Sequence, residues 1–131
     1  MPKSHDTVAA ALRKFGLAFP GAHSKSPWPE HDDLAVKDKT FAFMSVPGVR
    51  LSVTVKLTVS HAEALQHPCA KPTGYGLGKS GWVTLNFPAE EKPPVDLLKR
   101  WILESYRAVA PKRLLAELEA QQPWTRMGVV K

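Results

Sequence analysis

Two short runs of the chain alternate strictly between apolar and polar side chains. The apolar positions of segments 50–57 and 82–87 lie two residues apart: Leu51, Val53, Val55 and Leu57, then Val83, Leu85 and Phe87. Successive side chains of a strand point to opposite faces, so each run predicts a strand with one buried and one wet face. The sheet they build is expected to carry a polar face made of Ser52, Thr54, Lys56, Thr84 and Asn86.

Further strands are predicted ahead of the first run. Segments 34–37 and 40–46 are rich in apolar and β-branched residues, and Asp38-Lys39 lies between them as a turn. Pro47-Gly48 then separates the second segment from the run at 50–57. Three consecutive antiparallel strands are the natural interpretation, with the run at 82–87 joining the same sheet.

Helices are predicted at both ends of the chain and between the strands. Apolar residues at helical spacing predict helices over 4–15 and 60–66, from Asp96 toward Pro111, and over 111–120. Ser4 and Ser60 are the expected N-caps of the first two, Glu63 the capping-box partner of Ser60, and Gly16 the stop of the first helix. This order predicts an α+β fold: one domain, 1–131, with an antiparallel sheet and helices packed on one face.

Composition favours a compact chain with an anionic partner. The 131 residues are 44% hydrophobic and carry a net charge of +6 with a pI near 9.6, which suits nucleic acid as well as simple solubility. A single cysteine, Cys69, excludes an intrachain disulfide. We identify no secretion signal and no membrane-spanning run, so a cytoplasmic protein without a membrane partner is expected.

A glycine-rich segment, Gly74-Tyr-Gly-Leu-Gly-Lys-Ser80, precedes the strand at Trp82. It is similar to a phosphate-binding P-loop, but that motif needs a glycine where Thr73 stands. A P-loop also follows a strand and opens a helix, whereas this segment follows a helix and opens a strand. A nucleotide-hydrolysing site is therefore not expected, and the segment is interpreted as a basic loop that contributes Lys79 and Ser80.

Titratable residues do not form a recognisable catalytic or metal-binding motif. Glu30, His31, Asp32 and Asp33, with His23 nearby, lack the spacing of a metal site and are interpreted as a polar turn. The residues His61, His67 and Cys69 lack the paired spacing of a zinc site. We expect no catalytic residue, metal or cofactor; an enzyme or metal protein would require His23, His31 and Asp33 to converge in space.

Basic residues are grouped on neighbouring elements of the predicted sheet. Lys37 and Lys39 flank a hairpin turn, and further cations follow on the next strand and around the glycine segment: Arg50, Lys56, Lys71 and Lys79. Such a set can contact phosphates, with Trp82 and the polar sheet face meeting bases or backbone. An ordinary wet sheet face with extended lysines explains the pattern equally well. A second basic set on the C-terminal helices is interpreted as a solvated helix face.

Segments 19–21, 28–37, 39–43, 73–82 and 98–107 with Lys112-Arg113 form a combined pattern. Its most specific parts are the glycine segment ending in Gly81-Trp82 and Glu104-Ser105-Tyr106. On these residues the chain resembles the MmcQ/YjbR-like family of small bacterial proteins. The resemblance implies a compact α+β domain related in shape to the frataxin-like sandwich, with a double-wing arrangement proposed to bind DNA. No catalytic set is implied.

Together these patterns predict a monomeric, non-enzymatic DNA-binding protein. The expected phosphate contacts are Lys37, Lys39, Arg50, Lys56, Lys79 and Arg107, with Ser80 and Trp82 beside them. The alternative is a small-molecule or protein-interaction module, with a cleft lined by Trp28, Tyr75 and Trp82 at the glycine segment. A continuous basic face favours the first hypothesis, and a concave, partly apolar pocket at Tyr75 and Trp82 favours the second.

Overall fold

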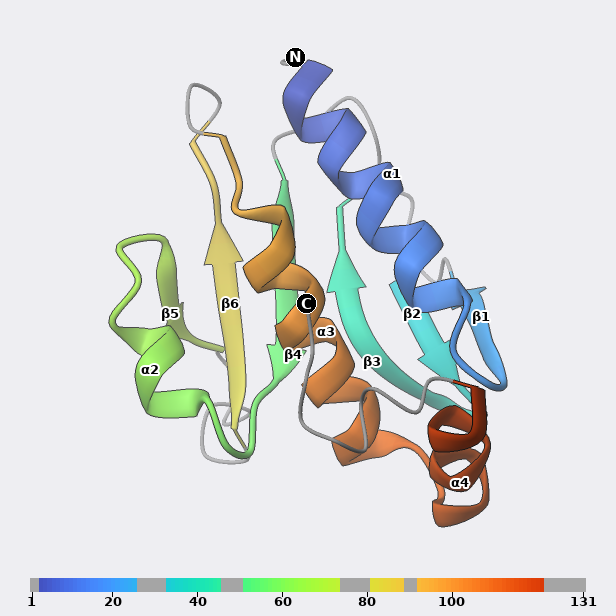
Figure 1. Ribbon diagram of the computed structural model, residues 1–131. Helices are drawn as coiled ribbons and strands as arrows, with labels where there is room; N and C mark the ends of the chain where they lie inside the picture. Colours follow the sequence, from blue (N-terminus) through green and yellow to red (C-terminus); the bar gives the residue numbers. More distant parts are fainter. Residues whose placement is uncertain (1–2, 26–32, 46–50, 74–80, 89–91, 122–131) are drawn as a thin grey trace.

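A computed structural model of the chain describes residues 3–25, 33–45, 51–73, 81–88 and 92–121 (Figure 1). Six strands form one antiparallel sheet in the order β1-β2-β3-β4-β6-β5. The strands are β1 (Ala22–Lys25), β2 (Asp33–Val36), β3 (Lys39–Met44), β4 (Ser52–Lys56), β5 (Ala70–Pro72) and β6 (Trp82–Asn86). The helices are α1 (Lys3–Leu17), α2 (His61–Leu65), α3 (Val95–Val109) and α4 (Lys112–Gln121). The predicted α+β class with an antiparallel sheet is confirmed.

The two alternating runs form the centre of the sheet. β4 pairs with β6 in a register that sets Ser52 opposite Asn86, Thr54 opposite Thr84 and Lys56 opposite Trp82. On the other face Val53, Val55, Val83 and Leu85 are completely buried. The predicted division into an apolar and a polar face is therefore confirmed strand by strand.

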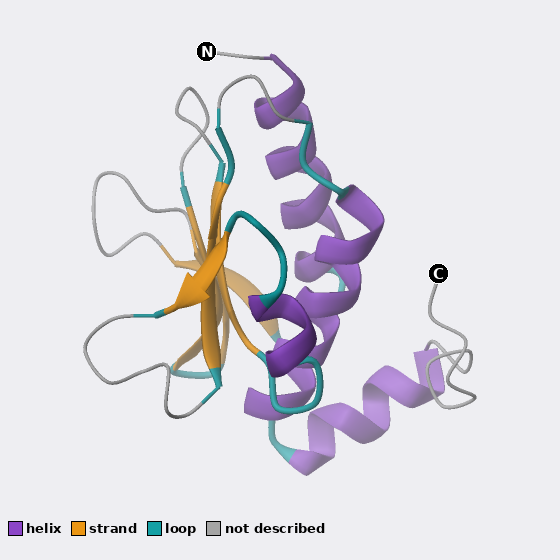
Figure 2. Ribbon diagram, turned by 90° about the vertical axis from the view of Figure 1, so that its left-hand side faces the viewer, coloured by secondary structure: helices purple, strands orange, loops and turns teal. Residues whose placement is uncertain are grey.

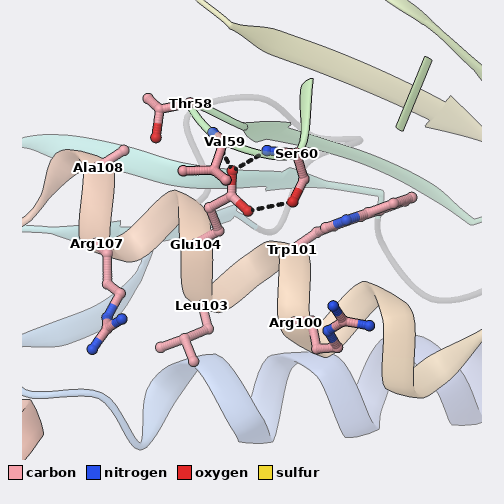
Figure 3. Close-up of a pocket in the computed structure, with 9 residues that line it drawn as sticks. All are labelled: Thr58, Val59, Ser60, Arg100, Trp101, Leu103, Glu104, Arg107 and Ala108. Atoms are coloured by element: carbon pink, nitrogen blue, oxygen red, sulfur yellow. Dashed lines mark hydrogen bonds between the residues drawn. The ribbon is translucent and has the colours of Figure 1, made fainter. Parts of the chain in front are cut away.

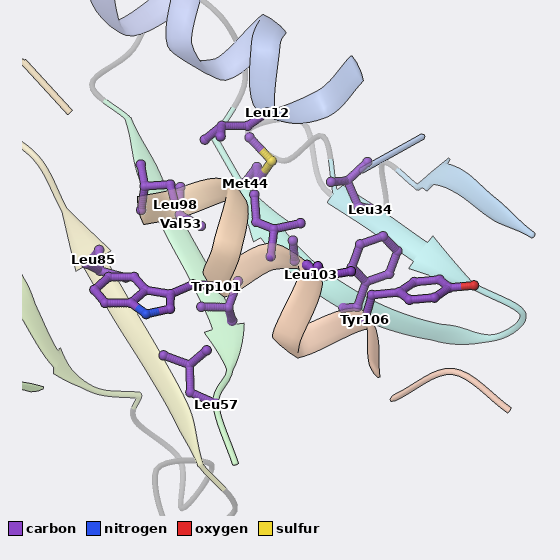
Figure 4. Close-up of a cluster of buried hydrophobic side chains, with 14 of the residues drawn as sticks. Leu12, Leu34, Met44, Val53, Leu57, Leu85, Leu98, Trp101, Leu103 and Tyr106 are labelled. Atoms are coloured by element: carbon purple, nitrogen blue, oxygen red, sulfur yellow. The ribbon is translucent and has the colours of Figure 1, made fainter. Parts of the chain in front are cut away.

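The described helices lie on the apolar side of the sheet (Figure 2). The longest buried stripe belongs to α3, whose Leu98, Trp101, Ile102 and Tyr106 are at most 3% exposed. These side chains meet Leu12 of α1 and the inward residues of the strands in one cluster (Figure 4). Burial of this apolar surface is the main favourable term that holds the two layers together.

A bulge between β2 and β3 turns an aromatic residue into this cluster. Leu34 pairs with Ala42 but Ala35 pairs with Thr40, so Phe41 is the extra residue of β3. Its ring lies 5.3 Å from that of Tyr106 and 6.0 Å from that of Phe19. The bulge thus lets Phe41 join the core while Phe43, two residues later, points to the opposite face.

The first helix differs from its prediction at both ends. It begins at Lys3, so Ser4 is a helical residue and not the N-cap, and it continues to Leu17, past Gly16. A Cβ atom at Gly16 would lie 2.5 Å from Cδ1 of Leu34. Gly16 therefore lets α1 approach β2 closely instead of ending the helix.

The expected capping box of the short helix α2 is wrong. Ser60 makes no side-chain cap hydrogen bond; its hydroxyl donates instead to Oε1 of Glu104, at 2.8 Å. The Glu104 carboxylate also accepts a hydrogen bond from the Ser60 amide, the donor that Glu63 was expected to engage, so a residue of α3 takes the place of the capping-box glutamate.

Two strands were not predicted at all. β1 and β5 are only 4 and 3 residues long and lie at the two edges of the sheet. Their sequences, Ala-His-Ser-Lys and Ala-Lys-Pro, have too few apolar residues to show a period of two.

None of the helices in the described part of the chain combines the length and apolar character needed to cross a bilayer.

Candidate functional site

The face of the sheet opposite the described helices is here called the open face. Its side chains alternate with the buried ones along each strand and come from β3 to β6: Phe43, Ser52, Thr54, Lys56, Lys71, Trp82, Thr84 and Asn86. All of them are partly or fully accessible to solvent. Apart from the two aromatic rings, every one is a hydroxyl, an amide or a lysine.

The two aromatic rings of the open face meet above β4. Phe43 extends from β3 and Trp82 from β6, the strands on either side of β4. Their ring centroids are 5.5 Å apart at an interplanar angle of 63°, an edge-on arrangement favoured by aromatic quadrupoles. Lys56 lies directly opposite Trp82 in the register. An aromatic surface with a cation beside it therefore lies over β4, near the end of that strand at Lys56.

Three threonine hydroxyls form a row next to the aromatic pair. Oγ1 of Thr84 lies 3.0 Å from Oγ1 of Thr54 and 2.9 Å from Oγ1 of Thr73. The row crosses β4, β6 and the end of β5. Since each hydroxyl has one proton and two lone pairs, the row retains capacity for hydrogen bonds to a ligand.

The strands carry an excess of positive charge. Among the strand side chains that the structure describes, the lysines are Lys39, Lys56 and Lys71, and the acidic residue is Asp33. Asp33 is fully buried, and its Oδ1 accepts a hydrogen bond from the Met44 amide at 2.8 Å. Its charge is therefore held inside the sheet, and the accessible charge of the strands is basic.

The β2–β3 hairpin presents Lys39 together with one further cation of the predicted set, Lys37. Lys37 and Lys39 are both exposed, on either side of Asp38. Lys37 has a positive φ of 55°, and its carbonyl lies 2.8 Å from Nε2 of His23 on β1. This contact holds the turn against the edge strand. The hairpin and the end of β4 with Lys56 lie at the same, lower end of the sheet in Figure 1.

The predicted binding residues thus divide into three groups. Lys37, Lys39, Lys56 and Trp82 lie on the sheet, at or near its lower end. Arg107 lies on α3, in the helical layer, and is not brought next to them. The remaining predicted residues lie outside the described part of the chain: Arg50, Lys79 and Ser80.

The predicted acidic and histidine cluster cannot be placed as a whole. His23 and Asp33 are described, whereas Glu30, His31 and Asp32 lie outside the described residues. Across the described ranges, no group of three or more histidine, cysteine, aspartate or glutamate side chains could hold a metal ion. The single cysteine of the chain, Cys69, is half-buried.

The segment Glu104-Ser105-Tyr106 anchors α3 to three distant parts of the chain. The Glu104 carboxylate accepts hydrogen bonds from the Val59 and Ser60 amides, at 2.8 and 2.9 Å, and from the Ser60 hydroxyl. The Tyr106 hydroxyl donates to the Pro20 carbonyl at 2.6 Å. Burial, together with the nearby Glu117 carboxylate, raises the pKa of Tyr106 to about 12. These contacts give the segment a structural role that its sequence alone did not reveal.

Ser105, between them, completes the sheet itself. Its hydroxyl donates to the Phe41 carbonyl of β3 at 2.5 Å and accepts from the Lys56 amide of β4 at 2.8 Å. The direct β3–β4 pairing extends from Met44–Val53 to Ala42–Val55 and stops there. A helix hydroxyl thus joins the two strands immediately beyond the last paired residues.

A pocket of about 370 Å³ opens on the helical side of the molecule (Figure 3). It lies between α3 and the segment that links β4 to α2. Its lining combines hydroxyl, charged and apolar side chains: Thr58, Val59, Ser60, Arg100, Trp101, Leu103, Glu104, Arg107 and Ala108. The cleft expected at Tyr75 and Trp82 is a different place, and Tyr75 lies outside the described residues.

Comparison with known proteins agrees with this architecture. A family model described as YjbR matches residues 17–108, from the end of α1 to the end of α3. The crystal structure of protein DR2400 of Deinococcus radiodurans, described as a DUF419 domain, superposes with a TM-score of 0.65. The two chains share 24% sequence identity, and the match covers 86% of each. No curated protein matches the chain.

Proposed function

Because the chain belongs to the YjbR family and carries a basic, aromatic sheet face, we propose that it binds nucleic acid, DNA in the first instance, through the open face. The observation that carries this proposal is the Phe43–Trp82 pair with Lys56 opposite Trp82. Aromatic rings on a sheet stack on bases of any sequence, and a neighbouring lysine neutralises the phosphate that follows.

The hydroxyl row and the hairpin lysines support the same partner. Thr54 and Thr84 present hydroxyls beside the aromatic pair, and hydroxyls are common donors to phosphate and sugar oxygens. Lys37 and Lys39 extend the positive surface to the lower end of the sheet. These lysines are proposed to contact phosphates, since ammonium groups act as point charges with little base specificity. Binding would then be tolerant of sequence.

Three further residues belong to the proposal on sequence grounds. Arg50, Lys79 and Ser80 border strands of the open face in the sequence and are proposed as additional phosphate contacts. Arg107 is left out of the set, because it lies in the helical layer behind the sheet. We propose a monomeric, cytoplasmic binding protein without catalytic activity.

Fluorescence anisotropy with labelled duplex and single-stranded DNA and RNA, over a salt series, tests the proposal. We expect the affinity to fall steeply with salt, and Lys56→Gln to lower the slope of log K against log salt by about one. For single strands, Trp82→Leu should weaken binding by about tenfold, because one stacked base contributes roughly 1–3 kcal/mol.

A matched control separates a local interface from general charge attraction. Lys112→Gln removes the same charge from an exposed position on α4, in the helical layer, and should leave the affinity nearly unchanged. The proposal is wrong if no nucleic acid binds at low salt, or if Lys112→Gln weakens binding as much as Lys56→Gln.

A further inference from the structure

The pocket beside α3 has a rigid polar wall. Among the described residues, Val59 and Ser60 donate three hydrogen bonds to the Glu104 carboxylate, at 2.8 to 2.9 Å. Figure 3 shows this carboxylate directed toward the 58–60 segment, with the guanidinium groups of Arg100 and Arg107 directed away from it. The negative charge is thus compensated by fixed donors, and the two arginines remain available on the other side.

The two arginines are weakly engaged by the protein itself. Arg100 is exposed and has neither an ion pair nor a hydrogen bond with any residue of the described ranges. Arg107 approaches Glu119 of α4 at 3.8 Å, with side chains 37% and 41% exposed. An ion pair of that length and exposure is worth little, so a ligand can replace it at small cost.

The spacing of the arginines defines the shape of a suitable ligand. Seven residues along a helix correspond to about two turns, or about 10 Å between Cα atoms. Leu103 lies between the arginines on the same side of α3 but, like Trp101, is only 3% exposed. The apolar part of the lining that solvent reaches comes from Val59, which is 85% exposed, and from Ala108. In Figure 3 the two guanidinium groups lie on either side of Leu103, so a short chain with an acidic group at each end matches them better than one small head group.

The geometry points to this pocket as a binding site for a small organic dianion, such as a linear dicarboxylate. One acidic group pairs with Arg100, the other with Arg107, and the apolar chain lies against Val59 and Ala108. The volume of about 370 Å³ falls at the lower end of the range typical of small-molecule sites. The site lies on the opposite side of the sheet from the open face, so this inference is independent of nucleic-acid binding.

Titrations followed by amide NMR shifts test the inference on the full chain. The probes are glutarate and suberate, with hexanoate as the monocarboxylate of intermediate length. The amides of Val59 and Ser60 should report binding, because both donate to Glu104 in the pocket wall. We expect a dicarboxylate to bind about tenfold more tightly than hexanoate, a difference of about 1.4 kcal/mol for the second arginine–carboxylate pair.

Variants locate the site on α3. Arg100→Gln and Arg107→Gln should each reduce the preference for the dicarboxylate to less than about threefold. Arg113→Gln removes an equal charge from an exposed position of α4 outside the pocket lining and should leave the preference unchanged. Arg100 has no partner to lose within the described residues, so its replacement is expected to leave the fold intact.

Three outcomes would overturn the inference. They are the absence of shifts at Val59 and Ser60 with either dicarboxylate, equal binding of hexanoate, and an equal loss of preference in Arg113→Gln. A single-stranded oligonucleotide provides a further arm. If it shifts the same amides in an Arg100-dependent manner, the pocket binds nucleic-acid phosphate, and the small-dianion assignment is wrong.

Discussion

Ser105 shows how much one side chain can matter in a fold of this size. By its helical spacing it belongs to the buried stripe of α3, and it is indeed completely buried. Its hydroxyl, however, links the Lys56 amide to the Phe41 carbonyl across two strands. Buried backbone groups of this kind must find partners inside the protein. A serine at this position is therefore a requirement of the sheet as well as of the helix.

We expect Ser105→Ala to destabilise the protein by about 2–3 kcal/mol, because a buried amide and a buried carbonyl each lose a partner. Urea denaturation measures the free energy of unfolding. Ser52→Ala is the matched control, since its hydroxyl lies on the open face, and it should cost at most about 0.5 kcal/mol. Equal losses in the two variants would contradict the role assigned to Ser105.

Tyr106 makes the stability depend on alkaline pH. Burial, reinforced by Glu117, raises its pKa from 10.0 to about 12 in the folded protein. The folded state therefore retains the phenol proton that the unfolded chain loses. The stabilisation is complete below pH 10 and is lost as the pH rises toward about 12.

The measurement is the free energy of unfolding of the natural chain and of Tyr106→Phe across this window. The natural chain should lose up to about 1.4 kcal/mol more per pH unit than Tyr106→Phe, which has no proton to lose. At neutral pH the variant should be less stable, because the Pro20 carbonyl loses its donor. Parallel pH profiles would refute the assignment.

At the scale of elements, regular sequence patterns predicted the strands and helices well. Contacts between residues distant in sequence could not be predicted. The alternation at Val53, Val55 and Leu85 identified β4 and β6 because each strand has one buried face. β1 is too short for such a pattern, and its place at the sheet edge follows from pairing with β2. The capping box at Ser60 failed because a distant competitor, the Glu104 carboxylate, accepts hydrogen bonds from the Ser60 hydroxyl and from the Ser60 amide that Glu63 was expected to engage. Local sequence does not contain such competitors.

The link from the glycine segment to β6 depends on Gly81. Its φ is +98°, and an added Cβ atom would lie 2.8 Å from the Leu57 carbonyl oxygen. We expect Gly81→Ala to cost about 2–3 kcal/mol of stability, because backbone strain and a backbone clash act together. Thermal and urea denaturation provide the measurement.

Gly21→Ala is the comparison for this effect. Gly21 also has a positive φ, of +71°, but its added Cβ atom would meet the end of the Leu114 side chain at 3.0 Å. A side chain can yield where a carbonyl cannot, so we expect a smaller loss of about 1 kcal/mol. A larger loss for Gly21→Ala than for Gly81→Ala would show that the carbonyl contact is unimportant.

At the scale of the molecule, the layering could be predicted, but the position of every cation could not. Alternation required helices on one face of the sheet, and Figure 2 shows them there. Arg107 was grouped with Lys56 by charge alone, yet the buried core separates the pocket side of α3 from the open face. Which way a helix rotates on a sheet depends on side chains such as Trp101 and Tyr106, whose partners are distant in sequence.

The helix α4 lies beyond the segment matched by the family model, yet it contributes to the core. Leu118 is completely buried, although the match ends at residue 108. We expect Leu118→Ala to destabilise the protein by about 3 kcal/mol through a lost contact surface and a cavity. Val59→Ala, at a position 85% exposed, should change stability by less than about 0.5 kcal/mol in the same denaturation experiment.

The anchoring of α3 by Glu104, Ser105 and Tyr106 has a consequence for folding kinetics. These three consecutive residues bind partners 45, 64 and 86 positions earlier in the chain. Contacts of such long range close large loops, and proteins dominated by them fold slowly. During synthesis these three contacts can form only after residue 106 has left the ribosome, so the part of the sheet that depends on them is completed late.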